Sequence, residues 1–309
     1  MKFPKNLIKG DKIAVISPAG AVEENQLTAT LSLIESQGFQ PVLGNYVYGK
    51  YDNGFVYSGT EEQRIADMNW ALNDPEIAAV WAARGGYGCQ HLVQHLDWHV
   101  VSENPKWYIG YSDNTVIQSG LLQHHIPSIH GQTIKTSSFG VSDDSYQYIF
   151  DILQGNIPQY IIESHHLNRI GEARGTLVGG NLALIYALLG TEYSFDFQDK
   201  ILFIEEIGEQ YYALDRMLMS LEMAGVFNKI KGLIVGGMTN MGKEADNRYY
   251  AESFDTLANQ LILERLQHYP FPLLFHFPNG HIFHNVPLII GTKTKMMVKP
   301  SESLIQMER

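Results

Sequence analysis

Apolar and polar residues alternate between strand-like and helix-like runs through the first half of the chain. The strand-like runs are short and nearly continuously apolar: residues 12–18, 40–44, 77–86 and 107–109. The runs between them repeat their apolar positions at helical spacing: residues 25–38, 60–75, 88–98 and 115–122. Such alternation predicts an α/β fold with a largely parallel sheet covered by helices.

The pattern weakens between Tyr146 and Glu172, where the sequence is typical of irregular or edge-strand structure. Strand and helix signals then resume. Strands are predicted at 200–209, 230–238 and 272–298, with a Gly/Asn-rich turn inside the last, and helices before Gly190 and over 212–225 and 257–269. We therefore expect two α/β domains, residues 1–150 and 175–309, joined by a connecting segment at 151–174.

Composition excludes some classes of partner. The 309-residue chain is 45% hydrophobic and carries a formal charge of −11, which disfavours nucleic acids and anionic membranes. The sequence contains a single cysteine, Cys89, and no signal-peptide pattern or apolar run long enough to span a membrane. The expectation is a cytoplasmic protein.

An abrupt corner separates the strand at 107–109 from the helix at 115–122, and Ser112 lies in it. A serine there would be lifted out of the sheet, beside backbone N–H groups that open the helix and could stabilise an oxyanion. Gly110-Tyr111-Ser112 supplies half of a G-x-S-x-G nucleophile pattern, with Asn114 in place of the second glycine. From the local sequence, a nucleophile and a simple helix cap are equally good interpretations.

A serine nucleophile needs a base that a third group orients. His281 lies in a Gly-containing turn between apolar runs, where a solvated histidine has little reason to be. Glu205 and Glu206 follow a buried strand, so a carboxylate there could enter a cleft and hold an imidazole. A solvated strand end is the alternative for both glutamates.

Three groups of histidines raise a competing interpretation, a metal site. The first group, His91, His95 and His99, has helical spacing; the other two are His276, His281 and His284, and His124, His125 and His130. No Cys cluster, zincin-type Glu or paired carboxylates accompany them, so a polar helix face is the better interpretation of the first group. The Gly-rich turn 84–88 lacks the third glycine of a dinucleotide fingerprint, and its glycines would instead allow close approach to a substrate.

Six segments in register resemble the LD-carboxypeptidase family, the serine peptidases also known as muramoyltetrapeptide carboxypeptidases. The segments are IAVISPAG (13–20), ARGGYG (83–88), IGYSDNT (109–115), GTLVGGNLALI (175–185), ILFIEEIGEQYYALDRML (201–218) and NGHIFHNVPLIIG (279–291). The resemblance spans nearly the whole chain. It implies a flavodoxin-like N-terminal domain, a swivelling β/β/α-type C-terminal domain, an active site at the domain interface and a homodimer.

The same resemblance implies a role for each residue that matches the family motifs. Ser112 would be the nucleophile, His281 the general base and Glu205 the orienting acid, with Glu206 as an alternative acid. The backbone N–H groups of Asp113 and Gly86 would form the oxyanion hole. The substrate-binding candidates are Arg84, Gly85 and Tyr87, and Arg84 could equally form a structural salt bridge.

The implied reaction removes the terminal D-alanine from cytoplasmic murein tetrapeptides during cell-wall recycling, with no metal or organic cofactor. A branch of the family instead cleaves microcin or acyl-adenylate conjugates, and it places tryptophans between nucleophile and acid. All four tryptophans here precede Ser112, which favours the murein substrate, although Tyr146, Tyr148 or Tyr160 could stack on a base instead. A metal-dependent hydrolase and a catalytically silent binding protein are the readings from other classes.

Overall fold

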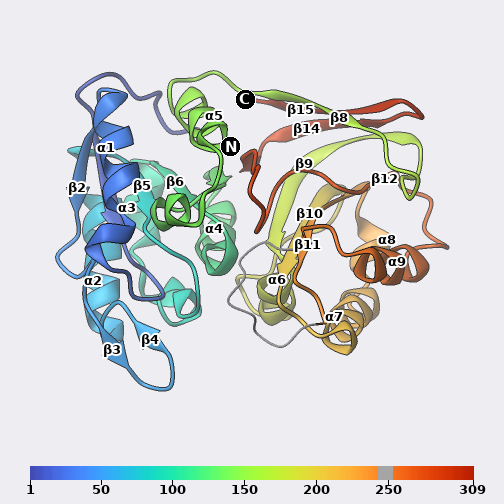
Figure 1. The fold of residues 1–309 in the computed structure, drawn as a ribbon, viewed down its shortest axis with the longest axis horizontal. Coiled ribbons are helices and arrows are strands. Elements are labelled where there is room, and N and C mark those ends of the chain that lie inside the picture. Colours follow the sequence, from blue (N-terminus) through green and yellow to red (C-terminus); the bar gives the residue numbers. More distant parts are fainter. Residues whose placement is uncertain (243–252) are drawn as a thin grey trace. The chain divides into compact units, whose positions relative to one another are not determined.

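The computed structural model describes residues 1–242 and 253–309, and the chain divides into two units, Met1–Asn156 and Ile157–Arg309 (Figure 1). We call these unit 1 and unit 2. The division falls after helix α5 (Asp143–Leu153) and before strand β8 (Gln159–Glu163). It therefore lies within the segment 151–174 that the sequence marks as a connection.

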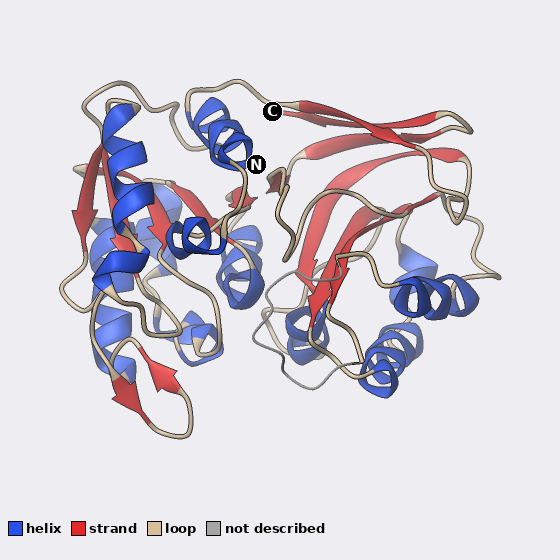
Figure 2. Cartoon of the chain, viewed as in Figure 1, coloured by secondary structure: helices blue, strands red, loops and turns tan. Residues whose placement is uncertain are grey.

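Unit 1 is built on a parallel sheet with its strands in the order β2-β1-β5-β6-β7 and helices beside it (Figures 1 and 2). The strands are β1 (Lys12–Ile16), β2 (Gln40–Leu43), β5 (Ile77–Ala82), β6 (Trp107–Gly110) and β7 (Ser128–His130). A small antiparallel hairpin, β3 (Tyr51–Asp52) and β4 (Val56–Tyr57), is separate from this sheet. Without the hairpin, the order is 2-1-3-4-5, the flavodoxin-like arrangement, so the predicted N-terminal fold is confirmed.

Helices connect the parallel strands of unit 1. The helices are α1 (Thr28–Ser36), α2 (Glu61–Asn73), α3 (Trp98–Glu103), α4 (Thr115–Gln123) and α5, with short 3-10 turns η1 (Glu24–Gln26), η2 (Cys89–His91), η3 (Val93–His95), η4 (Ser112–Asn114) and η5 (Ile134–Phe139). The central strands β5 and β6 are almost fully buried, which explains their continuous apolar sequences. In such sheets ligands bind beyond the carboxyl ends of the strands, which is where Arg84 and Ser112 lie.

Unit 2 contains a mixed sheet with the strand order β12-β11-β10-β9-β14-β15-β8 (Figure 1). Four strands are parallel: β9 (Gly171–Asn181), β10 (Lys200–Ile207), β11 (Gly232–Thr239) and β12 (Leu273–Leu274). The antiparallel strands are β8, β14 (Lys293–Val298) and β15 (Glu302–Glu308). The other elements are β13 (Leu288–Ile290), α6 (Leu182–Leu188), α7 (Tyr211–Met223), α8 (Val226–Lys229) and α9 (Thr256–Arg265).

Two sequence-based predictions of secondary structure are wrong in part. The helix expected over 88–98 is broken into η2 and η3, because tertiary contacts hold the chain at Gly88 and Asp97 then caps a new helix, α3. The segment from Tyr146 begins as helix α5, not as irregular structure. Its buried residues Tyr146, Ile149, Phe150 and Leu153 have the spacing of a helix face.

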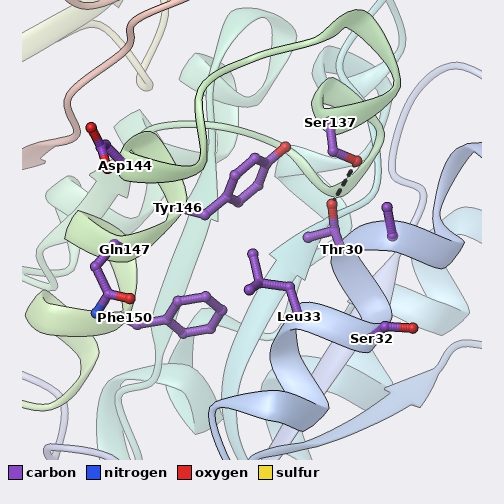
Figure 3. Close-up of a pocket in the computed structure, with 9 residues that line it drawn as sticks. Thr30, Ser32, Leu33, Ser137, Asp144, Tyr146, Gln147 and Phe150 are labelled. Carbon is purple, nitrogen blue, oxygen red and sulfur yellow. Dashed lines mark hydrogen bonds between the residues drawn. The ribbon is translucent and has the colours of Figure 1, made fainter.

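A cavity of about 500 Å³ lies between α1 and α5 in unit 1 (Figure 3). Leu33, Tyr146 and Phe150 supply its apolar wall, and Thr30 bonds Ser137 across its rim at 2.8 Å. None of the predicted catalytic, oxyanion-hole or substrate-binding residues lines this cavity, although the stacking candidate Tyr146 does. In the described ranges, no helix combines the length and apolar character needed to cross a membrane.

Candidate active site

Ser112 occupies a conformation that few residues other than glycine adopt. The chain leaves β6 at Gly110, Tyr111 is extended, and Ser112 then has φ +63° at the start of η4. Left-handed backbone at a serine is unfavourable and requires support from its surroundings. The strand therefore turns into helix within two residues and presents the serine at the corner, as the sequence predicts.

Asn114 supplies that support and explains why the second glycine of the motif is absent. Its Nδ2 donates to the Tyr111 carbonyl at 2.9 Å, and its Oδ1 accepts from the Tyr108 hydroxyl at 2.5 Å. Gly110 is needed on the other side, since a Cβ there would lie 2.8 Å from Asn114 Cγ. The hydrogen bonds of the Asn114 side chain thus stabilise the turn at Ser112, where the usual motif has a second glycine.

The Gly-rich turn after β5 packs directly on the serine. A Cβ at Gly85 would lie 2.9 Å from Ser112 Cβ and 3.1 Å from Ser112 Oγ. Gly86 and Gly88 have φ of +117° and +134°, which an L side chain rarely adopts. The turn therefore needs its glycines for close approach to the serine and for its backbone path.

One peptide group in this turn is held at both ends. The Gly88 carbonyl accepts from Arg64 Nη1 at 3.1 Å, and the Cys89 N–H of the same peptide donates to Asp113 Oδ2 at 2.8 Å. Arg64 Nη1 also donates to the Pro18 carbonyl at 2.8 Å. We call this arrangement the Arg64–Asp113 clamp. It fixes the Gly-rich turn to the residue that follows the nucleophile.

The members of the clamp are buried. Arg64 is 3% exposed and stacks its guanidinium 4.8 Å from the centre of the Tyr57 ring. Burial raises the pKa of the Asp113 carboxyl, while the hydrogen bond from the Cys89 N–H opposes that shift. Charged partners in this setting form strong, directional hydrogen bonds. The clamp is consequently a buried, hydrogen-bonded part of unit 1.

The predicted substrate-binding residues differ in their surroundings. Arg84 donates from Nη1 to the Ala21 carbonyl at 2.8 Å. Tyr87 is 44% exposed, and its ring meets the Phe55 ring edge-on at 6.1 Å. Gly85 contacts the serine, so the turn reaches from the nucleophile to the protein surface.

Unit 2 brings Glu205 and His281 together. Glu205 lies near the carboxyl end of β10 and is fully buried, and its Oε2 lies 2.7 Å from His281 Nδ1. Gly280 has φ +120°, and a Cβ there would lie 2.9 Å from Glu205 Oε2, so only glycine fits. Thr239 Oγ1 donates to the His281 carbonyl at 2.9 Å. The carboxylate thus holds the imidazole through Nδ1, as the orienting acid of a catalytic triad does.

Glu206 has a different environment from Glu205. Its carboxyl accepts from Asn181 Nδ2 and from the N–H groups of Ala183 and Ile207 at 2.7–2.9 Å. Burial, and then the charge of Glu205, raise its pKa to about 8. Of the two glutamates that the sequence leaves open, Glu205 is the one that pairs with His281 in the structure.

The predicted histidine groups do not assemble. His91, His95 and His99 lie on three separate short helices, so their expected common helix face is wrong. The His276 ring stacks on that of His165 with 3.9 Å between centroids. In the described part of the chain, no three His, Cys, Asp or Glu side chains are arranged to hold a metal ion.

Sequence reasoning missed Arg64, Asn114 and Gln118 as parts of the site. Gln118 Nε2 donates to the carbonyls of Gly110 and Ile129, both at 3.0 Å, and so ties the end of β6 to β7. Gln118 and Asn114 follow the serine closely, and polar residues in an otherwise apolar helix were an available signal. Arg64 is far away in sequence and gives no comparable signal.

A strained serine beyond a parallel sheet and a buried carboxylate–imidazole pair are the components of a serine hydrolase. Family models sharpen this assignment. Residues 13–131 match the LD-carboxypeptidase N-terminal domain, and residues 174–296 match the LD-carboxypeptidase C-terminal domain.

Relatives match over nearly the whole chain. A probable murein peptide carboxypeptidase of Bacillus subtilis is 31% identical, over 98% of this chain and 94% of its own. The murein tetrapeptide carboxypeptidase of Pseudomonas aeruginosa is 30% identical, over 87% of this chain and 88% of its own. The chain belongs to the LD-carboxypeptidase family and is a serine carboxypeptidase by class.

Solved structures agree with this two-domain fold. The muramoyltetrapeptide carboxypeptidase of Oxalobacter formigenes superposes with a TM-score of 0.83 at 25% identity, covering 96% of this chain and 99% of its own. The microcin C7 self immunity protein MccF, in its wild-type apo state, has a TM-score of 0.82 at 22% identity and covers 99% of this chain and 98% of its own. At that identity the second likeness concerns the fold alone.

Proposed function

We propose that this chain is an LD-carboxypeptidase that removes the terminal D-alanine from murein tetrapeptides. The observation that carries the proposal is the match to the murein tetrapeptide carboxypeptidase of P. aeruginosa, 30% identical over 87% of this chain. The left-handed Ser112 and the Glu205–His281 pair support it, since they are the groups that such a reaction requires.

In the acylation step, Ser112 Oγ attacks the carbonyl carbon of the scissile amide. His281 Nε2 takes the hydroxyl proton, and Glu205 stabilises the resulting imidazolium through Nδ1. The N–H groups of Asp113 and Gly86 donate to the tetrahedral oxyanion. The C–N bond then breaks, and His281 gives the proton to the amine of the departing D-alanine.

In the deacylation step, His281 takes a proton from water and the hydroxide attacks the acyl-serine ester. The second tetrahedral oxyanion collapses, the C–O bond to Ser112 breaks, and the proton returns to the serine oxygen. Neither step requires a metal ion or an organic cofactor. The products are the shortened peptide and D-alanine.

The alternative is cleavage of a microcin or acyl-adenylate conjugate, which the fold of MccF motivates. Such a substrate needs an aromatic ring to stack on its base. Tyr146 and Tyr160 are 1% and 5% exposed and use their hydroxyls to bond the Thr133 and Pro287 carbonyls. Two of the three tyrosines that could have replaced the missing tryptophans are therefore engaged in packing, which favours the murein substrate.

The test is the release of D-alanine from a purified muramoyl-tetrapeptide, with an aminoacyl sulfamoyl adenosine assayed in parallel. We expect cleavage of the tetrapeptide by the wild type, abolished in Ser112→Ala and unchanged by EDTA. Cleavage of the adenosine conjugate alone would establish the alternative. Loss with EDTA but not with Ser112→Ala would indicate a metal-dependent hydrolase, and turnover of neither substrate would indicate a binding protein.

The family resemblance also supports a cytoplasmic homodimer, which we include in the proposal. Size-exclusion chromatography with light scattering should give a mass near 70 kDa, about twice the 34.9 kDa of the chain. Fractionation of the source cells should recover the protein with cytoplasmic markers. A monomeric mass, or recovery with the periplasm, would contradict the respective statement.

A further inference from the structure

Lys135 is a buried cation in unit 1 without an anionic partner. It lies in η5, directly after β7, and is only 8% exposed. Its ammonium group lies 5.5 Å from the centre of the Phe139 ring, and the residues that the structure describes form no ion pair with it. Buried charges are normally paired, because removal of an ion from water is costly. Lys135 thus lacks the usual compensation.

The backbone around Lys135 is held firmly. Its N–H donates to the Ala83 carbonyl at 2.9 Å, beyond the end of β5. Thr30 Oγ1 donates to the Ile134 carbonyl at 2.8 Å and bonds Ser137, so α1 anchors the same 3-10 turn from the other side (Figure 3). The position of Lys135 is therefore built into the fold.

A second cation, Arg84, follows Ala83 in the chain. Its guanidinium packs on Gly20, where a Cβ would lie 3.2 Å from Arg84 Cζ, and it bonds the Ala21 carbonyl. Burial, and then the charge of Arg84, lower the pKa of Lys135 to about 8, so the two cations repel each other. Glu23 is the acid that opposes this shift, and it forms a salt bridge with Lys50.

Backbone contacts connect both cations to the end of β5, next to the turn that contacts the nucleophile: the Lys135 N–H bonds the Ala83 carbonyl, and Arg84 follows Ala83. Arg84 is adjacent in sequence to Gly85, whose Cβ position is 3.1 Å from Ser112 Oγ. In a carboxypeptidase substrate, the terminal carboxylate is separated from the scissile carbonyl carbon only by one nitrogen and one Cα, a span of about 3–4 Å. The group that binds this carboxylate must therefore lie close to the serine, and Arg84 directly precedes the glycine that contacts it.

We propose that Lys135 and Arg84 form a subsite for the terminal carboxylate of the substrate. The inference rests on the proposed function and names the feature by which the enzyme would select a chain end. A carboxylate between the two cations supplies the missing counter-charge and accepts charge-assisted hydrogen bonds from both. An internal peptide bond offers no such anion, which explains selectivity for the last residue.

The test compares two substrates that differ only at the terminus, a muramoyl-tetrapeptide ending in D-alanine and the same peptide ending in D-alaninamide. We expect the wild type to prefer the free acid, and Lys135→Met to lower kcat/KM for the acid about 10- to 100-fold, chiefly through KM. Activity on the amide should stay near the wild-type value, which also shows that the variant is folded. Lys135→Arg should retain most of the preference.

The control is Lys5→Met, which removes an exposed lysine and should leave both substrates unaffected. A wild type that cleaves the tetrapeptide while Lys135→Met keeps the full preference for the acid would overturn the subsite alone. A wild type that cleaves both peptides equally would do the same. No cleavage of the tetrapeptide by the wild type would remove the proposed function, and the subsite with it.

Discussion

Because its backbone is left-handed, Ser112 should make the folded protein less stable than glycine at the same position would. With φ +63°, the serine adopts a conformation that costs an L residue about 1–2 kcal/mol and glycine almost nothing. Ser112→Ala and Ser112→Gly both remove the hydroxyl, which forms no hydrogen bond with any described residue. Only the glycine variant relieves the strain, so the comparison of the two variants isolates it.

The expected difference follows from two opposing terms. Glycine removes a backbone strain of about 1–2 kcal/mol from the folded state. Its greater freedom in the unfolded chain opposes this gain by about 0.5–1 kcal/mol. The Ser112 side chain is only half-buried, so its Cβ contributes little packing. Ser112→Gly should therefore be more stable than Ser112→Ala by about 0.5–1 kcal/mol, or roughly 1–4 °C in Tm.

Calorimetry on the two variants would measure this difference, and Ser32 provides a matched control. Ser32 lies within helix α1, where glycine is less favourable than alanine by about 1 kcal/mol. The order should therefore reverse: Ser32→Gly should unfold at a lower temperature than Ser32→Ala. If Ser112→Gly is no more stable than Ser112→Ala, Ser112 is unstrained and the reasoning fails.

Three further predictions concern residues around the site. Arg64→Met should lower kcat about 10- to 100-fold with little change in KM, because loss of the clamp frees the turn that carries an oxyanion donor; a rise in KM alone would contradict this. Glu205→Gln should lower kcat by about 10³–10⁴ in D-alanine release, because His281 loses its charged partner; an unchanged kcat would exclude Glu205 as the triad acid. Glu206 binds its proton more tightly in the folded state, with a pKa of about 8 against an ordinary 4.5. The unfolding free energy of the wild type should therefore fall relative to Glu206→Gln as pH rises from 5 to 8, by at most about 1.4 kcal/mol per unit; urea unfolding that shows no pH-dependent difference would contradict the shift.

Local sequence was enough to predict the strand–helix alternation of unit 1 and the corner at Ser112, because both depend on short-range patterns. Apolar runs identify β5 and β6, and a helix pattern directly after a strand leaves room for only a tight turn. The left-handed backbone of Ser112 was not predictable, because nothing in Gly110-Tyr111-Ser112 distinguishes it from an ordinary helix cap. That conformation depends on the Asn114 side chain and on the packing of Gly85.

Residues that act across long sequence separations were beyond local patterns. Arg64 belongs to a helix whose sequence is unremarkable, and its bond to Gly88 joins positions 24 residues apart. The same contact explains the wrong helix at 88–98, whose periodicity is genuine but whose start is pinned by tertiary hydrogen bonds. Glu205 and His281 lie 76 residues apart. Local patterns offered both as candidates, and the family resemblance then assigned Glu205 as the orienting acid.

Two separate groups of contacts position the serine and the carboxylate–imidazole pair, and Asn114, which stands in place of the second glycine of the motif, belongs to the first. In unit 1, Asn114, Gly85 and the Arg64–Asp113 clamp hold the serine and its neighbouring turn. In unit 2, Gly280 and Thr239 hold the Glu205–His281 pair. Because each group of contacts lies within one unit, a substitution in the clamp should impair catalysis without moving the imidazole from its carboxylate. Preorganisation of this kind lowers the reorganisation required in the transition state.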